Sequence, residues 1–159
     1  MHEPSPVLVV DGHNDTLFAL ESTLEQLRYP LLRACGTSEA LKVLLHAHPA
    51  VILLNVGTDS TGELDLVHRM RRLDPVRDVP VVLLSSTGSE RDLSALGYRL
   101  AVADLVLMPV DPWVLRIKVR HLYETQVALR ALRRAAAPVA VPSPTADSDS
   151  GVPSGVHNP

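Results

Sequence analysis

Short apolar runs recur along most of the chain and are separated by amphipathic stretches, and this alternation limits the possible folds more than any other feature. The runs are apolar on successive residues, as expected of strands that are covered on both faces of a parallel sheet. Between them, apolar residues return at intervals of three and four, as on one face of a helix. The five runs begin at Val7, Leu31, Val51, Val81 and Leu105.

Helix-capping residues support the same division of the chain. A polar residue or an acid-proline pair precedes most of the amphipathic stretches, as at helix starts. Five strand-helix units joined by right-handed crossovers predict an α/β, flavodoxin-like, doubly wound fold with a five-stranded parallel sheet. The capping candidates are Asn14, Asp15, Thr37, Ser38, Ser89 (with Asp92) and Asp111 (with Pro112).

The chain changes character near its carboxyl end. No helix breaker interrupts 113–136, so an extended last helix is expected to overrun the sheet. Residues 138–159 contain five Pro, four Ser and two Gly but no Leu, Ile, aromatic or Lys/Arg residue, which predicts a disordered tail. The expected organisation is one domain over residues 6–134 followed by this Pro/Ser-rich tail.

Composition restricts the function classes. There are 15 basic and 18 acidic residues, a net charge of −3, so binding to nucleic acid is not expected. No apolar run approaches the ~20 residues that cross a bilayer. The single cysteine, Cys35, forms no disulfide within the chain and suits a reducing compartment. A cytoplasmic protein without a membrane partner is predicted.

Polar or unusual residues stand where the predicted strands end. In doubly wound sheets the functional crevice lies beyond the carboxyl ends of the strands. Asp11 ends the first run, Asn55 the third and Ser85 the fourth, and Met108-Pro109 follows the fifth. These residues are the candidate site.

From about Pro6 to Arg134 the chain resembles the receiver domain of bacterial two-component response regulators. The resemblance rests on four segments in the right order: 7–15, 51–56, 81–85 and 104–112. It implies an acceptor Asp in the third strand, two acids that hold Mg²⁺ after the first, a Ser or Thr after the fourth and a Lys-Pro after the fifth. It also implies a cis peptide bond at Met108-Pro109.

Residue by residue, most of that chemistry is missing. Asn55 occupies the acceptor position, Gly12 replaces one metal-binding acid and Met108 replaces the lysine. Ser85 keeps the hydroxyl position, and Leu105 stands at the usual aromatic switch position. We therefore expect an atypical or pseudo-receiver with no catalytic residue, which is not phosphorylated in the usual way. Mg²⁺ binding is expected to be weak or absent, with Asp11 as the residual candidate ligand.

Single residues leave alternatives open. Asn55 is expected to bond nearby backbone in preference to a ligand, and Asp11 to cap a helix or pair with a local donor in preference to binding a metal. Asp59, in the following loop, is a weaker candidate for a displaced acceptor. His46 and His48 are expected to be surface residues and not a metal site.

Three function classes were compared. The leading hypothesis is a stand-alone receiver in phosphorelay signalling that contacts a kinase, a regulator or a second copy of itself through the fourth helix, fifth strand and last helix. The alternative is a small-molecule sensor that uses the emptied pocket, with Met108 as an adaptable lining residue. An enzyme is not expected, because no catalytic constellation is present. A homodimer through the last helix would be weak, because Lys118 and Thr125 interrupt its heptad pattern. Arg130, Arg133 and Arg134 are expected to form a solvated basic face or to contact an acidic partner. The candidate interface residues are Leu93, Leu96, Leu105, Leu115, Leu122, Leu129 and Leu132.

Overall fold

The computed structural model describes residues 3–57, 61–86 and 90–136 and confirms the predicted fold class. Strands and helices alternate strictly along the chain, apart from one short 3-10 turn. The elements are β1 (Val7–Asp11), α1 (Asn14–Leu24), the 3-10 turn η1 (Glu25–Leu27), β2 (Leu31–Cys35), α2 (Thr37–His46), β3 (Val51–Val56), α3 (Thr61–Met70), β4 (Val81–Ser85), α4 (Glu90–Leu100), β5 (Asp104–Leu107) and α5 (Pro112–Ala135).

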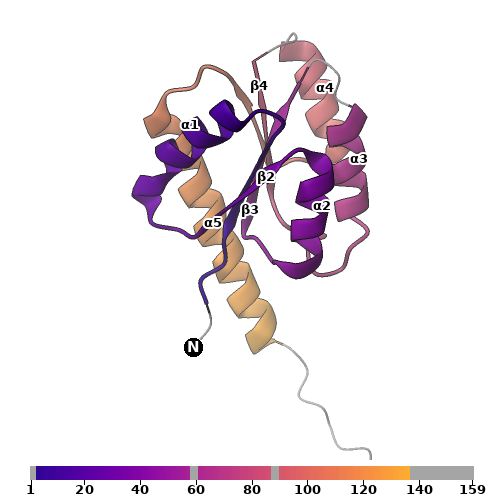
Figure 1. Ribbon diagram of the computed structural model, residues 1–159. Helices are drawn as coiled ribbons and strands as arrows, with labels where there is room; N and C mark the ends of the chain where they lie inside the picture. Colours follow the sequence, from indigo (N-terminus) through magenta and orange to yellow (C-terminus); the bar gives the residue numbers. More distant parts are fainter. Residues whose placement is uncertain (1–2, 58–60, 87–89, 137–159) are drawn as a thin grey trace, which may run out of the picture.

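All neighbouring strands are parallel, in the order β2-β1-β3-β4-β5. Helices α1 and α5 cover one face of the sheet, and α2, α3 and α4 cover the other (Figure 1). Because side chains alternate along a strand, the central strands supply both cores: Leu8 and Val10 face one, Val7 and Val9 the other. This double burial explains why the runs are apolar on successive residues.

The N-cap of the last helix agrees with the prediction, whereas the N-caps of α1 and α2 do not. Asp111 is the N-cap of α5, and its Oδ1 accepts from the Trp113 N–H at 2.7 Å, as predicted. At α1 the prediction was wrong, because His13 is the N-cap and Asn14 lies inside the helix. At α2 the N-cap is Gly36, whose φ of 96° favours glycine. Ser89, the candidate cap of α4, lies outside the described residues.

The carboxyl end of α5, which was expected to overrun the sheet, forms polar contacts with its own domain. The Arg130 guanidinium donates to the carbonyl oxygens of His48 and Pro49, at 3.2 and 2.7 Å, and to Ser5 Oγ at 3.1 Å. One turn further, Arg133 lies 3.2 Å from an Asp78 carboxylate oxygen. Arg130 is therefore half-buried and structural, not part of a solvated basic face. The predicted tail, 138–159, lies outside the described residues.

In the part of the chain that the structure describes, no helix is both long and apolar enough to cross a bilayer.

Candidate functional site at the carboxyl edge of the sheet

The sheet brings the predicted site residues to one edge. Asp11 is the last residue of β1 and Ser85 the last of β4, while Asn55 lies one residue before the end of β3. Since β1, β3 and β4 are adjacent and parallel, these three polar residues stand side by side. Asp11 and Ser85 are 3% and 1% exposed, so both are polar groups inside the core.

Asp11 and Asn55 form a closed pair. The Asn55 Nδ2 donates to Asp11 Oδ2 at 2.6 Å, and the His13 backbone N–H donates to Asp11 Oδ1 at 2.9 Å. The prediction of a local donor for Asp11 is confirmed. The prediction that Asn55 bonds backbone was wrong: its amide spans two strands to a carboxylate, and its Oδ1 is buried without a hydrogen-bond partner.

Both bonds to Asp11 come from uncharged donors. The His13 ring also approaches this carboxylate: its Nδ1 lies 3.5 Å from Asp11 Oδ1, and the His13 side chain is 86% exposed. Lys118 does not take the place of the missing lysine, because its Nζ is bonded to Asp104 Oδ2 at 2.8 Å. The site therefore has a buried carboxylate that amide donors satisfy, and Asn55 supplies one of these donors.

Gly12 occupies the position where the resemblance implies a second metal-binding acid, and there is free space around it. A Cβ built on Gly12 meets nothing within 4 Å, so the backbone leaves room there for a larger side chain. Gly12 also borders a cavity of about 280 Å³ between β1, β3 and the first turns of α2 and α3. Asp11, Asn55, Thr37 and Glu63 contribute its polar lining.

Ser85 and Met108 belong to the same edge of the sheet. Neither is among the residues that line the cavity. The Met108 N–H donates to the Ser85 carbonyl at 2.8 Å, and its side chain packs partly buried against the α1–α5 core. That Met108 lines the emptied pocket stays a prediction, and part of its side chain is used in packing. The predicted cis bond at Met108-Pro109 is confirmed.

No metal centre emerges from the described residues. Within 3–57, 61–86 and 90–136, no group of three His, Cys, Asp or Glu side chains could hold an ion. His46 and His48 are exposed, as predicted. Asp59, the candidate displaced acceptor, lies outside the described residues.

The candidate interface residues divide into three groups. Leu115 is 1% exposed and packs in the α1–α5 core, so its assignment to a partner surface was wrong. Leu96, Leu105 and Leu122 pack half-buried against the two cores. Leu129 and Leu132 are exposed, at 41% and 65%; nothing is described of the Leu93 side chain.

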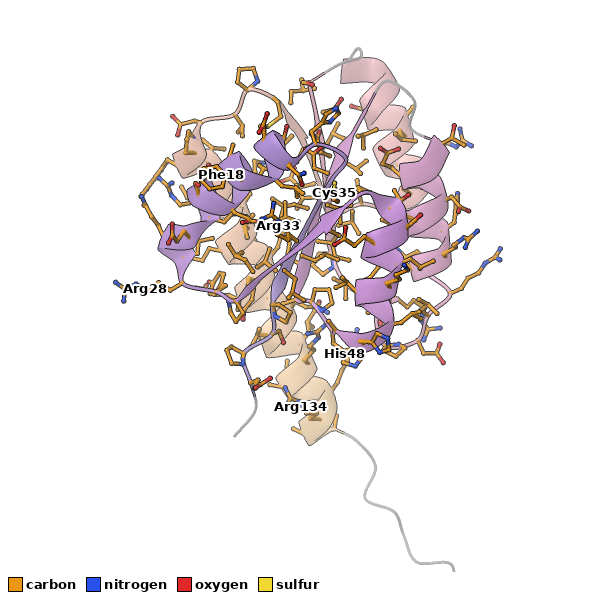
Figure 2. The ribbon with its side chains drawn as sticks, viewed as in Figure 1. Phe18, Arg28, Arg33, Cys35, His48 and Arg134 are labelled. Atoms are coloured by element: carbon orange, nitrogen blue, oxygen red, sulfur yellow. The ribbon has the colours of Figure 1, made fainter. Side chains whose placement is uncertain are left out.

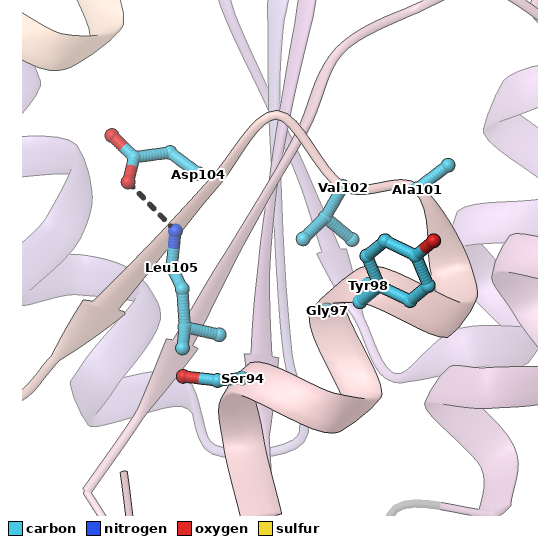
Figure 3. A pocket seen from close by; sticks show the side chains of 7 residues that line it. All are labelled: Ser94, Gly97, Tyr98, Ala101, Val102, Asp104 and Leu105. Atoms are coloured by element: carbon cyan, nitrogen blue, oxygen red, sulfur yellow. Dashed lines mark hydrogen bonds between the residues drawn. The ribbon is translucent and has the colours of Figure 1, made fainter. Parts of the chain in front are cut away.

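Aromatic and aliphatic residues that the sequence analysis missed are exposed around β5. Tyr98 is 90% exposed and borders an open pocket of about 440 Å³ between α4 and β5 (Figure 3). Gly97 allows α4 to pack closely against Val102, because a Cβ at position 97 would lie only 3.1 Å from Val102 Cγ2. Near the start of α5, Trp113 and Ile117 are also exposed. Helical spacing could not find them, since they lie off the apolar stripe.

Comparisons with known proteins agree with this geometry. No family model matches the chain. In sequence it is 27% identical over 106 residues to "Phosphate regulon transcriptional regulatory protein PhoB" of Pseudomonas aeruginosa, covering 67% of this chain and 46% of that protein. It is 27% identical over 116 residues to "Probable transcriptional regulator ycf27" of Cyanophora paradoxa, covering 73% and 47%. The chain thus spans about half the length of the curated relatives it matches.

Solved structures show the same fold. A CheY-like response regulator receiver domain protein from Methanospirillum hungatei superposes with a TM-score of 0.69 at 17% identity, covering 80% of this chain and 99% of that one. The signal receiver domain of a putative Luxo repressor protein from Vibrio parahaemolyticus reaches 0.72 at 13% identity, covering 82% and 98%. In sequence the chain is similar to response regulators, and in fold it is similar to CheY-like receiver domains.

Proposed function

We propose that this chain is an atypical receiver that does not accept a phosphoryl group and that signals through protein–protein contact. The proposal starts from the receiver fold and from relatives whose names describe transcriptional regulators. The part of the proposal that concerns phosphorylation depends on the geometry of the Asp11–Asn55 site.

The hydrogen bond between Asn55 and Asp11 is the observation that supports it most. A phosphoryl acceptor must present a free carboxylate oxygen, whereas the amide at position 55 is not a competent nucleophile. That amide also uses one oxygen of Asp11, the residual candidate for Mg²⁺. With Met108 packed away, no lysine at this position neutralises the charge of a transferring group.

Incubation with acetyl phosphate and Mg²⁺, followed by intact mass spectrometry, tests the proposal. The native protein should keep its mass. Asn55→Asp alone should be phosphorylated poorly, because two of the three replaced groups are still missing. A stable adduct of one phosphoryl group on the native protein would contradict the proposal.

A triple variant provides the matched positive control. Gly12→Asp, Asn55→Asp and Met108→Lys together restore the acid pair, the acceptor and the cation, and the open space at Gly12 accommodates the new side chain. This variant should gain phosphoryl groups under the same conditions. The contrast shows whether the scaffold is intact and only the chemical groups are absent.

The surface around β5 is the contact surface that we propose. Tyr98, beside the α4–β5 pocket, and Trp113 offer exposed aromatic area, which commonly anchors protein interfaces. A signalling protein, either a kinase or a regulator, is the proposed partner. Charge substitution at Tyr98 (Tyr98→Glu) should reduce its capture in pull-downs, whereas Phe18→Glu on α1 serves as the control for an equally apolar exposed site.

Ligand sensing is a second candidate function, favoured by the cavity beside Asp11. Its volume of about 280 Å³ and its mixture of carboxylate, amide and hydroxyl groups suit a small polar molecule. A thermal-shift screen of metabolites tests it. A hit should lose its effect in a Thr37→Val variant, which keeps the side-chain shape and removes a hydroxyl from the lining.

A further inference from the structure

A basic cleft lies at the carboxyl end of α5, at the opposite edge of the sheet from the Asp11–Asn55 pair. Its volume is about 320 Å³, and it is lined by His48, Pro75, Arg130, Arg133 and Arg134. His48 precedes β3, so the cleft belongs to the amino end of the strands, where Figure 2 shows His48 and Arg134 at the same end of the molecule. None of the residues assigned to the candidate site contributes to it.

Positive charge in the cleft exceeds the negative charge that contacts it. Arg130 donates to backbone carbonyls and a hydroxyl, and Arg134 to the Arg130 carbonyl at 3.4 Å. Asp78 pairs with Arg133. Burial, together with the nearby charges of Arg134 and Arg133, lowers the pKa of Arg130, as expected where guanidinium groups crowd together. The cleft therefore carries local positive charge, although the whole chain has a net charge of −3.

We infer that this cleft docks the acidic stretch Asp147–Asp149 of the chain's own carboxyl-terminal segment. Residues 137–159 carry these two carboxylates and no Lys or Arg, so their charge is not neutralised within the segment. Guanidinium groups bind carboxylates with paired hydrogen bonds, and Arg134 presents an exposed group for this purpose.

The covalent connection makes the contact geometrically accessible. Asp147 lies 11 residues beyond Ala136, which allows a reach of up to ~36 Å when extended and ~17–20 Å on average for a flexible chain. The rise from Arg130 to Ala136 along the helix is only ~9 Å. Tethering over such a distance gives an effective concentration in the millimolar range, so a weak contact can still be populated.

The contact should be reversible. Exposed ion pairs are individually weak and screened by salt, so the docked fraction should fall as ionic strength rises. An acidic partner could then displace the segment from the cleft. The contact adds an intramolecular interaction to the proposed receiver function and does not depend on it.

A spin label on the full chain tests the inference. Ser150→Cys in a Cys35→Ser background gives one attachment point, and paramagnetic broadening is read at the backbone amides of His48 and Val76, which lie beside the cleft but are remote in sequence. Broadening should be strong at low ionic strength and should fall at least two-fold in 0.5 M NaCl.

Charge-neutral variants supply the decisive comparison. Asp147→Asn with Asp149→Asn, and separately Arg134→Gln, should each cut the broadening at least two-fold. Thr145→Ala with Ser148→Ala in the segment and Arg28→Gln on the domain are the matched controls and should leave it unchanged. Arg130 is left intact, because it holds the Ser5 and His48–Pro49 backbone in the fold.

Two results would overturn the inference. One is equal broadening in the native and charge-neutral chains, which would show chance proximity of the tether. The other is a set of cleft shifts induced by sodium sulfate in all variants, without any effect of the two aspartates, which would identify a small-anion site instead of a docking site for the segment.

Discussion

Asn55 changes the character of its neighbour as well as its own position. A carboxylate at 3% exposure needs donors, and Asn55 supplies one at 2.6 Å while the His13 N–H supplies another. Without the amide, a buried Asp11 oxygen would lose its partner, at a cost of about 1–3 kcal/mol. The hydrogen bond from Asn55 therefore stabilises the buried Asp11 carboxylate.

Asn55→Asp should destabilise the fold in a pH-dependent way. Two carboxylates at this separation repel, so the pKa of the pair in the folded state rises above its unfolded value. Folding is then penalised above that raised pKa, by on the order of 2 kcal/mol near pH 7, and the penalty shrinks as the pH falls through it. Urea denaturation between pH 4 and pH 8, without Mg²⁺, measures the effect.

Asn55→Ala separates charge repulsion from the loss of a hydrogen bond. It should cost about 1–3 kcal/mol at pH 7 because Asp11 Oδ2 loses its donor. This variant has no second carboxylate, so its penalty should depend on pH less strongly than that of Asn55→Asp. If both variants showed the same pH profile, repulsion between two carboxylates would not be the cause.

At the level of elements, α5 joins parts of the chain that are distant in sequence. Its Tyr123 hydroxyl donates to the Ser5 carbonyl at 2.6 Å, and its ring stacks on Tyr29 with centroids 3.7 Å apart. Arg130 adds bonds to Ser5 and to the segment before β3. The end of the helix thus fastens the amino-terminal segment to the sheet.

Arg130→Gln should lower the free energy of unfolding by about 1–2 kcal/mol, because bonds from a charged donor to two carbonyls are lost. Arg134→Gln, four residues on and fully exposed, should change it by less than about 0.5 kcal/mol. Urea denaturation of both variants measures the difference. Equal effects would show that the contacts of Arg130 do not stabilise the fold.

Alkaline pH should lower the free energy of unfolding through the two stacked tyrosines, Tyr29 and Tyr123. Burial is the main reason that the pKa values of Tyr29 and Tyr123 are raised above 10.0, with Glu124 adding to the shift at Tyr29. Because the folded-state pKa values exceed the unfolded ones, stability is full below pH 10 and falls as the pH rises through the folded values.

Tyrosinate absorbance followed alongside far-UV circular dichroism checks this pH dependence. Tyr123→Phe should reduce the loss of stability above pH 10, while costing about 1 kcal/mol at neutral pH through the lost bond to Ser5. An unchanged alkaline slope in this variant would contradict the assignment to Tyr123.

On the scale of the whole molecule, α5 presents Leu129 and Leu132 to solvent although the same turns are anchored to the domain. Covering each leucine in a second copy would contribute about 1.5–3 kcal/mol. Lys118 is engaged with Asp104 and does not extend the apolar seam, so a homodimer through this helix should be weak.

Leu129→Glu with Leu132→Glu should abolish any concentration-dependent self-association while the domain stays folded. Substitution is a better test than truncation after Tyr123, which would also remove buried Gln126 and the Arg130 bonds. Sedimentation velocity over a dilution series is the measurement, with Phe18→Glu as a control at another exposed apolar residue. If the native chain is a monomer throughout, the homodimer is excluded.

Periodicity determined most of the architecture in advance. A run of four residues that is apolar at every position, such as Val7–Val10, indicates a strand that is buried on both faces, as in a parallel sheet, and the breaker-free stretch after Pro112 indicates a long helix. The alignment of Asp11, Asn55 and Ser85 at one edge followed from parallel strand order alone.

Tertiary structure decided what each side chain contacts. The sequence placed Asn55 beside other strand ends, but only the register of β1 against β3 brings its amide to Asp11. Likewise Met108 packs partly buried against the α1–α5 core, and Arg130 bonds two carbonyls and a hydroxyl that are more than 80 positions away in sequence. The local sequence pattern indicates which face of an element is apolar, because every residue on a buried face must be apolar or have a hydrogen-bond partner. Hydrogen-bond partners, in contrast, depend on distances between elements, and these are set only when the chain has packed.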